Sequence, residues 1–140
     1  MGISVGVDIG GTKILAGIVN DQGQILSKVR KKTPRADASA VLEVVGEVIA
    51  ETIANVDGSI AGIGVGVAGP VDAASTTVLY APNLQWADVP VAALLENVTG
   101  LPVLVENDGS AAAWGEARFG GGKGFQDVVT VTIGTGIGGG

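Results

Sequence analysis

The stretch that decides the fold is residues 3–20, ISVGVDIGGTKILAGIVN. Apolar side chains in residues 3–9 alternate with small or polar ones, which is the period-two pattern of a buried strand. Gly10-Gly11 is a strong signal for a two-residue β-hairpin turn, and residues 13–20 supply the returning strand. The sequence therefore predicts an antiparallel pair at the start of the chain.

The pattern continues from this pair into a third strand and a helix. A turn at Asn20–Gly23 precedes a predicted strand over residues 24–33. Asp37 or Ser39 then fits the N-cap of a helix that runs to about Asn55, with apolar residues on one face at a spacing of 3.6. We interpret the charged groups of these two elements as solvent-exposed: Arg30, Lys31, Lys32, Glu43, Glu47 and Glu51.

The rest of the chain alternates strands with helices. The predicted strands are residues 60–67, 101–107 and 127–134, and the predicted helices are residues 89–100 and 108–120. A loop over residues 68–90 is long for a compact domain, which suggests binding. Three antiparallel strands followed by crossover helices predict one α/β domain, residues 1–140, with a mixed sheet. The small residues of the last helix predict close packing on that sheet.

Composition limits the classes of function. The chain has 140 residues, 46% of them hydrophobic, and a mean hydropathy of +0.47, which is too apolar for a disordered protein. A net charge of −6, with only 8 Lys and Arg, argues against a nucleic-acid partner. Zero Cys excludes disulfides and thiolate metal sites, and zero His removes the usual general base. No apolar run is long enough for a bilayer and no signal peptide precedes the first strand, so we expect a cytoplasmic enzyme without a membrane partner.

Glycine is unusually frequent and clusters at the edges of apolar runs. The chain has 24, against about 10 expected from an average usage of roughly 7%. Glycine turns can bind phosphate through backbone N–H groups even in an acidic protein. Two known nucleotide-binding patterns are matched only in spacing, and their surroundings exclude them. The G-x-G-x-x-G spacing at Gly64–Gly69 runs into a Pro-Val-Asp turn, and Gly6–Lys13 places Thr before Lys inside a hairpin, unlike a P-loop.

Residues 8–13, DIGGTK, are the first candidate site. A strand delivers Asp8 to a glycine hairpin that is followed by Thr12 and Lys13. Backbone N–H groups and the Thr12 hydroxyl can bind an anion, and Asp8 can hold Mg²⁺ through water. The alternative is an ordinary tight turn with a charged flank.

Two further polar stretches allow either a structural or a functional interpretation. Glu106-Asn107-Asp108 lies where a strand ends and a helix begins. Asp108 is either the N-cap of that helix or a carboxylate at the carboxyl edge of the sheet that accepts a proton from an attacking hydroxyl; Asn107 would then bind hydroxyls. Asn83, with Trp86 nearby, is either a structural turn or part of a polyol site with an aromatic wall.

Five motifs occur in one order across the whole chain: DIGGTK, GVAGPV, APNLQW, VEND and the closing GTGIGGG. Together they closely resemble the ROK family (repressors, open reading frames and sugar kinases), and within it bacterial glucokinases. The resemblance implies the ribonuclease H-like, actin-like ATPase fold. It also implies phosphoryl transfer from ATP, with Mg²⁺, to the 6-hydroxyl of glucose or a related hexose. It covers the N-terminal lobe of such a kinase, so the family's cysteine-rich zinc motif would lie beyond Gly140 and no zinc site is expected in this chain.

Carried over by position, the resemblance assigns three groups of residues. The first phosphate loop would be Asp8, Gly10, Gly11, Thr12 and Lys13, with Asp8 near Mg²⁺. The second phosphate loop would be Gly134, Thr135, Gly136 and Gly138. The sugar ligands would be Gly69, Asn83, Asn107 and Asp108, with Asp108 also the base that deprotonates the attacking hydroxyl. The sequence departs from the family at Gly109-Ser110, where Ala-Asn is common, and Gly109 should loosen the first helical turn.

Two other interpretations remain open. The chain could be a non-catalytic sugar-binding lobe, such as the sensing lobe of a repressor, although its acidic charge and the lack of an N-terminal helix-turn-helix argue against DNA binding. It could also be an isolated lobe that self-associates, because an apolar face normally covered by the second lobe would be exposed.

Overall fold

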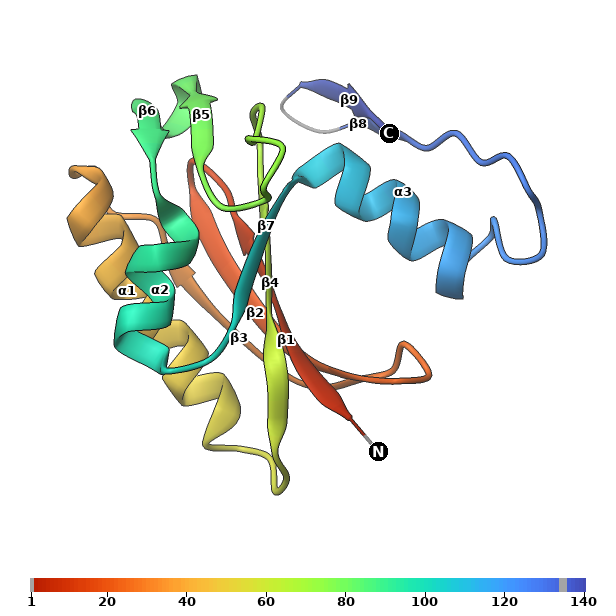
Figure 1. The fold of residues 1–140 in the computed structure, drawn as a ribbon, viewed down its shortest axis with the longest axis horizontal. Helices are drawn as coiled ribbons and strands as arrows, with labels where there is room; N and C mark the ends of the chain where they lie inside the picture. The colour runs from red at the N-terminus through yellow and green to blue at the C-terminus, as the bar shows by residue number, and fades with distance from the viewer. Residues whose placement is uncertain (1, 134–135) are drawn as a thin grey trace.

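A five-stranded mixed sheet forms the centre of the computed structural model, which describes residues 2–133 and 136–140. Its strands, in the spatial order β3-β2-β1-β4-β7 (Figure 1), are β1 (Ile3–Ile9), β2 (Lys13–Asn20), β3 (Ile25–Lys32), β4 (Ile60–Val67) and β7 (Val103–Asn107). The first three strands pair antiparallel, whereas β4 pairs parallel with both β1 and β7. The predicted meander followed by crossovers is confirmed.

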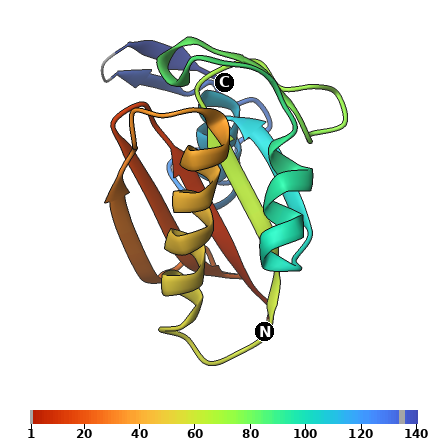
Figure 2. The same ribbon diagram turned by 90° about the vertical axis from the view of Figure 1, so that its left-hand side faces the viewer.

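Helices α1 (Ala38–Ile53) and α2 (Val91–Thr99) cover one face of this sheet (Figure 2). Asp37, one of the two predicted caps, begins α1, because its side chain accepts a hydrogen bond from the Ala40 N–H at 2.9 Å. Gly100 ends α2 with a φ of 68°, the left-handed conformation that glycine adopts at little cost. None of the helices in the described part of the chain is both long and apolar enough to cross a membrane.

The hydrophobic core lies between the sheet and these two helices. Alternate residues of β1 are buried on the helix side and exposed on the other, as the sequence pattern predicts. Among the described residues, every buried hydrophobic side chain falls between Ile3 and Val105. The opposite face of the sheet is therefore open over much of its area.

One charged group joins two elements. Lys31 Nζ, in β3, lies 3.1 Å from Glu47 Oε2 and 2.5 Å from Glu51 Oε1 on α1. Both glutamates are more than half exposed, in line with the solvent-exposed helix face expected from the sequence. Water screens these ion pairs, so they contribute little to the stability of the fold.

The stretch predicted as a long loop contains a hairpin. β5 (Val78–Ala81) and β6 (Trp86–Val89) pair antiparallel, joined by the short 3₁₀ helix η1 (Pro82–Leu84). Both ends of the hairpin are buried, with Val78 at 0% and Trp86 at 1% exposure. The expectation of an irregular loop is wrong here because four-residue strands are too short to show a clear sequence period.

The C-terminal segment differs most from the prediction. Helix α3 (Asp108–Phe119) buries only Gly109, so its predicted close packing on the sheet is wrong. The predicted strand over 127–134 is reduced to β8 (Val131–Ile133), which is exposed and pairs with β9 (Ile137–Gly139) instead of joining the sheet. The cause is the direction of α3, which leaves the sheet at the end of β7 and carries the chain away from it (Figure 1).

Candidate active site at the carboxyl edge of the sheet

Three parallel strands bring the predicted site residues to one edge of the sheet. β1, β4 and β7 run in the same direction, so their carboxyl ends meet there. The register places Asp8 level with Gly66 and Gly66 level with Glu106; one residue further on, Val67 lies level with Asn107. Residues that are about 100 positions apart in the sequence therefore share one edge.

The turn between β1 and β2 presents the first group of predicted phosphate ligands. The Gly10 N–H donates to Lys13 O at 2.9 Å and closes the turn, which leaves Gly11, Thr12 and Lys13 exposed. Thr33, at the end of β3, holds the turn from behind: its hydroxyl donates to Gly10 O at 2.6 Å and its N–H donates to Thr12 O at 3.1 Å. The role of Thr33 is not predictable from the sequence, because no local pattern connects it to a turn more than twenty residues earlier.

The glycine turn touches the hairpin that carries Asn83. A Cβ built on Gly11 would lie 3.1 Å from Asn83 O and 3.2 Å from Asn83 Cβ. Both distances are shorter than most contacts that Cβ atoms make in proteins. Glycine at position 11 thus lets the two backbones meet. Asn83 itself is exposed at the tip of the β5–β6 hairpin. A predicted phosphate ligand and a predicted sugar ligand are therefore neighbours.

Asn107 performs two structural tasks with one amide. Its Oδ1 accepts a hydrogen bond from the Ser110 N–H at 3.1 Å, which makes it the N-cap of α3. Its Nδ2 donates to Gly69 O at 3.1 Å and so joins the end of β7 to the loop after β4. Gly69 must be small, because a Cβ there would collide with Tyr80 O.

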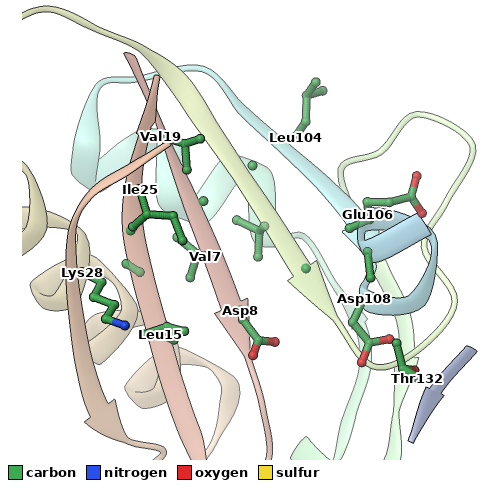
Figure 3. A pocket seen from close by; sticks show the side chains of 18 residues that line it. Val7, Asp8, Leu15, Val19, Ile25, Lys28, Leu104, Glu106, Asp108 and Thr132 are labelled. Atoms are coloured by element: carbon green, nitrogen blue, oxygen red, sulfur yellow. The ribbon is translucent and has the colours of Figure 1, made fainter. Parts of the chain in front are cut away.

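Asp108 is therefore not the N-cap that one interpretation of the sequence allowed. It is the first residue of α3, is exposed, and accepts a hydrogen bond from the Gly109 N–H at 2.9 Å. With Asn107 as the cap, the carboxylate of Asp108 is available for other contacts. Figure 3 shows Asp108 and Asp8 at the same end of a groove, with Thr132 beside Asp108 and the Glu106 carboxylate pointing away from both.

The charge of Asp108 acts on Asp8. The pKa of Asp8 lies above its ordinary value, first because of partial burial and then because of the negative charge of Asp108, while Lys13 opposes the shift. Two carboxylates that face the same space favour a hard cation with oxygen ligands, such as Mg²⁺. In the described part of the chain no cluster of three acidic, Cys or His side chains has the arrangement of a metal site. One or two carboxylates with water and phosphate oxygens are the usual ligand set of Mg²⁺, so these residues fit that ion.

Trp86 does not line the site. It is 1% exposed in the core, and its indole N–H has no hydrogen-bond partner among the described residues. The aromatic wall proposed from the sequence is therefore wrong. The exposed aromatic side chain of this hairpin is Tyr80, at 57% exposure.

The second predicted phosphate loop is described only in part. Gly134 and Thr135 lie outside the described residues, whereas Gly136 and Gly138 belong to the β8–β9 region. The hairpin comes close to the start of α3, since a Cβ on Gly109 would lie 2.7 Å from Gly139 O. Glycine at position 109, where the related motif often has alanine, is thus explained by this close approach.

A groove of about 640 Å³ runs from the two aspartates along the open face of the sheet (Figure 3). Its floor is rich in glycine, and Leu104 and Ile25 are exposed on its lining at 66% and 65%. Ala111 and Ala112 of α3 form one wall. The floor glycines are Gly6, Gly17, Gly64 and Gly66.

Comparison with known proteins gives a consistent result. The model of the ROK family matches residues 4–140. The chain is 47% identical, over its whole length, to a glucokinase from Streptomyces coelicolor, of which it covers 43%. A ROK family glucokinase from Streptomyces griseus, solved with glucose and AMPPNP, is 46% identical and superposes with a TM-score of 0.92 over 99% of this chain and 43% of its own. An inorganic polyphosphate/ATP-glucomannokinase from Arthrobacter superposes with a TM-score of 0.87 at 37% identity, over 99% of this chain and 57% of its own. The chain thus spans less than half the length of the glucokinases it matches.

Proposed function

This chain belongs to the ROK family, and on that premise we propose that it supplies the hexose-binding and phosphate-binding half of a hexokinase. The reaction transfers the terminal phosphoryl group of ATP to the 6-hydroxyl of glucose or a related hexose. The observation that carries the proposal is the position of Asp108, an exposed carboxylate that Asn107 frees from capping and that faces Asp8. The glucose and ATP analogue held by the Streptomyces griseus glucokinase support this choice of substrates.

The sugar contacts follow from what the site residues leave unused. The Asn107 amide donates one N–H to Gly69 O and accepts a hydrogen bond from the Ser110 N–H. One N–H and one lone pair remain, and both suit a sugar hydroxyl. Asn83 offers a second amide from the hairpin tip, and the Gly69 backbone contacts both Asn107 and Tyr80 of the hairpin. The hexose would therefore sit between the hairpin and the end of β7.

Asp108 acts as the general base in this assignment. Its carboxylate accepts the proton of the 6-hydroxyl as the hydroxyl oxygen forms a bond to the γ-phosphorus of ATP. The bond between that phosphorus and the bridging oxygen breaks, and ADP leaves with the electron pair. Such transfers depend mostly on positioning and on charge neutralisation, so few reactive side chains are needed.

The glycine turns would bind the phosphates. Gly10, Gly11 and Thr12 offer backbone N–H groups and a hydroxyl, and Lys13 adds a positive charge. Gly134, Thr135, Gly136 and Gly138 would contribute the second turn. Mg²⁺, held by Asp8 through water, would neutralise phosphate charge. We further propose that the open apolar face of the sheet is a surface for self-association.

A glucose titration of the ¹⁵N-labelled chain tests the sugar half of the proposal. Amide signals of Asn83, Asn107 and Asp108 should shift together with a single saturation curve, because all three border one sugar. Glycerol at the same concentration serves as the control for a non-specific polyol effect. A well-dispersed spectrum that does not respond to saturating glucose would contradict the assignment of the hexose site to this chain.

A further inference from the structure

A turn over residues 72–77, here called the Asp72 turn, is built around one carboxylate. Asp72 Oδ1 accepts hydrogen bonds from the N–H groups of Thr76 at 2.7 Å and Thr77 at 2.9 Å, and Oδ2 accepts one from the Thr76 hydroxyl at 2.9 Å. The Asp72 N–H donates to Thr77 O at 3.0 Å. These bonds, above all the one from the Thr76 N–H, favour the ionised carboxylate and hold the pKa of Asp72 below its ordinary value.

The Asp72 turn holds the outer edge of the sheet. β7 is the last strand, so its outward N–H groups need partners from other elements. Ser75 O accepts a hydrogen bond from the Val105 N–H at 2.8 Å, and Glu96 Oε1 accepts one from the Val103 N–H at 3.0 Å. Ser75 reaches this position with a φ of 57°, which is uncommon for a residue with a side chain. Ser75 thus keeps an uncommon backbone conformation where the turn bonds β7. This strand ends one residue before Asp108, the proposed base.

The same turn also anchors α2 and the β5–β6 hairpin. Thr76 O accepts a hydrogen bond from the Ala92 N–H at 3.0 Å, in the first turn of α2. On the hairpin side, the Leu79 N–H donates to Pro70 O at 2.9 Å, and Val71 pairs with Val78 in a β-bridge. One carboxylate therefore organises the junction between the hairpin and β7.

We propose that Asp72 is a positioning residue for the hexose site, whose turn fixes the hairpin tip carrying Asn83 relative to the end of β7 carrying Asn107 and Asp108. The inference rests on the hexose site proposed above. Asp72 itself touches neither sugar nor phosphate in this assignment. Its loss should weaken hexose binding and leave the glycine turn at residues 10–13 unchanged.

The test compares the wild-type chain with Asp72→Ala, Asp72→Asn and Asp57→Ala. Asp57 is an exposed aspartate in the loop before β4, so its variant controls for the loss of one negative charge. Amide hydrogen exchange at Val105 and Ala92 reports on the two bonds that the turn accepts. The glucose titration described above reports on the site.

Asp72→Ala should speed exchange at Val105 and Ala92 about tenfold or more and raise the glucose Kd about tenfold. Asp72→Asn keeps Oδ1 as an acceptor and offers an N–H to the Thr76 hydroxyl, so it should remain close to wild type in both measurements. Asp57→Ala should change neither, and exchange at Gly10 should be the same in all variants. If Asp72→Ala does not fold, Thr76→Val removes the Thr76 hydroxyl, with its bond to Asp72 Oδ2 and its contact with the Thr77 hydroxyl, but keeps both backbone bonds to Oδ1. It should give the same two effects at about threefold.

The exchange rates and the glucose Kd together test the positioning role of Asp72. Unchanged exchange at Val105 and Ala92 in Asp72→Ala overturns the proposal whether or not glucose binds. Faster exchange with an unchanged glucose Kd also overturns it, because the turn would then be structural only. A wild-type chain whose amides exchange as expected but which does not bind glucose contradicts the proposed hexose site. The positioning role of Asp72 for that site is then contradicted as well.

Discussion

At the scale of single residues, Asp8 shows how a functional position can oppose stability. Its raised pKa means that the folded chain binds the proton more tightly than the unfolded chain does. The ionised carboxylate therefore costs stability above the raised pKa, and the cost disappears as the pH falls below the ordinary value of 3.8. Asp8→Asn should raise the Tm at pH 7 by about 1–2 °C, a small effect because solvent still reaches and screens this partly buried carboxylate.

This gain should vanish at pH 3, where Asp8 is protonated in the wild type as well. Differential scanning calorimetry at both pH values measures it, with Asp57→Asn as the control for an exposed aspartate in another loop. A lower Tm for Asp8→Asn at pH 7 would contradict the unfavourable pairing of Asp8 with Asp108. The same variant should weaken the binding of Mg²⁺ with ATP, since it removes a ligand for the hydrated ion.

Asp108→Asn separates binding from proton transfer. The amide keeps the shape of the side chain and can still contact a hydroxyl, but it cannot accept the proton. We expect the complete enzyme that contains this chain to lose turnover while its hexose affinity stays within about tenfold, or about 1.4 kcal/mol. A coupled assay for ADP and a calorimetric hexose titration measure the two quantities. Glu106→Gln is the matched control because the Glu106 side chain points away from Asp8 and Asp108, and the amide keeps an oxygen for the Asn107 N–H. Lost binding with retained turnover in Asp108→Asn would refute the base assignment.

At the scale of elements, the start of α3 links helix capping to the site. Asn107→Asp keeps an oxygen for the Ser110 N–H and places negative charge at the helix N-terminus, but it loses the N–H that reaches Gly69 O. Asn107→Ala loses both bonds. Urea unfolding should show a loss of about 1–2 kcal/mol for Asn107→Ala and a smaller loss for Asn107→Asp, while both variants should weaken glucose binding. Equal stability losses would show that the cap contributes nothing measurable.

The elements also show which parts of the structure the sequence can predict. The meander, both core helices and the mixed sheet depend on local periods and turn signals, which residues such as Gly10 and Gly100 carry. The hairpin around Asn83 escapes prediction because its strands are four residues long. The roles of Thr33 and Asp72 are not predicted for a related reason. Thr33 bonds a turn more than twenty residues earlier, and the Asp72 turn bonds β7 and α2 through Ser75 and Thr76, which no local pattern encodes.

The C-terminal prediction fails for a different reason. Residues 127–134 are apolar enough that the sequence pattern predicts a buried strand. In the described residues α3 carries this segment away from the sheet, so Val131 and Ile133 remain exposed at 63% and 83%. A local pattern tells which residues prefer burial, but it does not tell which surface buries them.

At the scale of the whole molecule, the two faces of the sheet differ sharply. One is covered by α1 and α2, and the other is the floor of the groove, where Leu104 and Ile25 are exposed. A Cβ added to Gly6 or Gly64 on this face would meet no described atom within 4 Å, so nothing within the described chain requires glycine there. Glycine inside a strand costs about 0.5–1 kcal/mol relative to alanine, and it often marks a site where another backbone approaches.

An exposed apolar face of this kind promotes association. We therefore expect the 140-residue chain to self-associate through the groove as its concentration rises, which sedimentation equilibrium would detect. Leu104→Lys places a charge on the groove lining and should weaken the association about tenfold or more, because burying an unpaired ammonium is costly. Val98→Lys makes the same change at a residue of α2 that is also 66% exposed but lies on the covered side of the sheet, and it should have no effect. A strictly monomeric chain at high concentration, or equal effects of the two lysines, would show that the groove is not the surface through which copies of the chain meet.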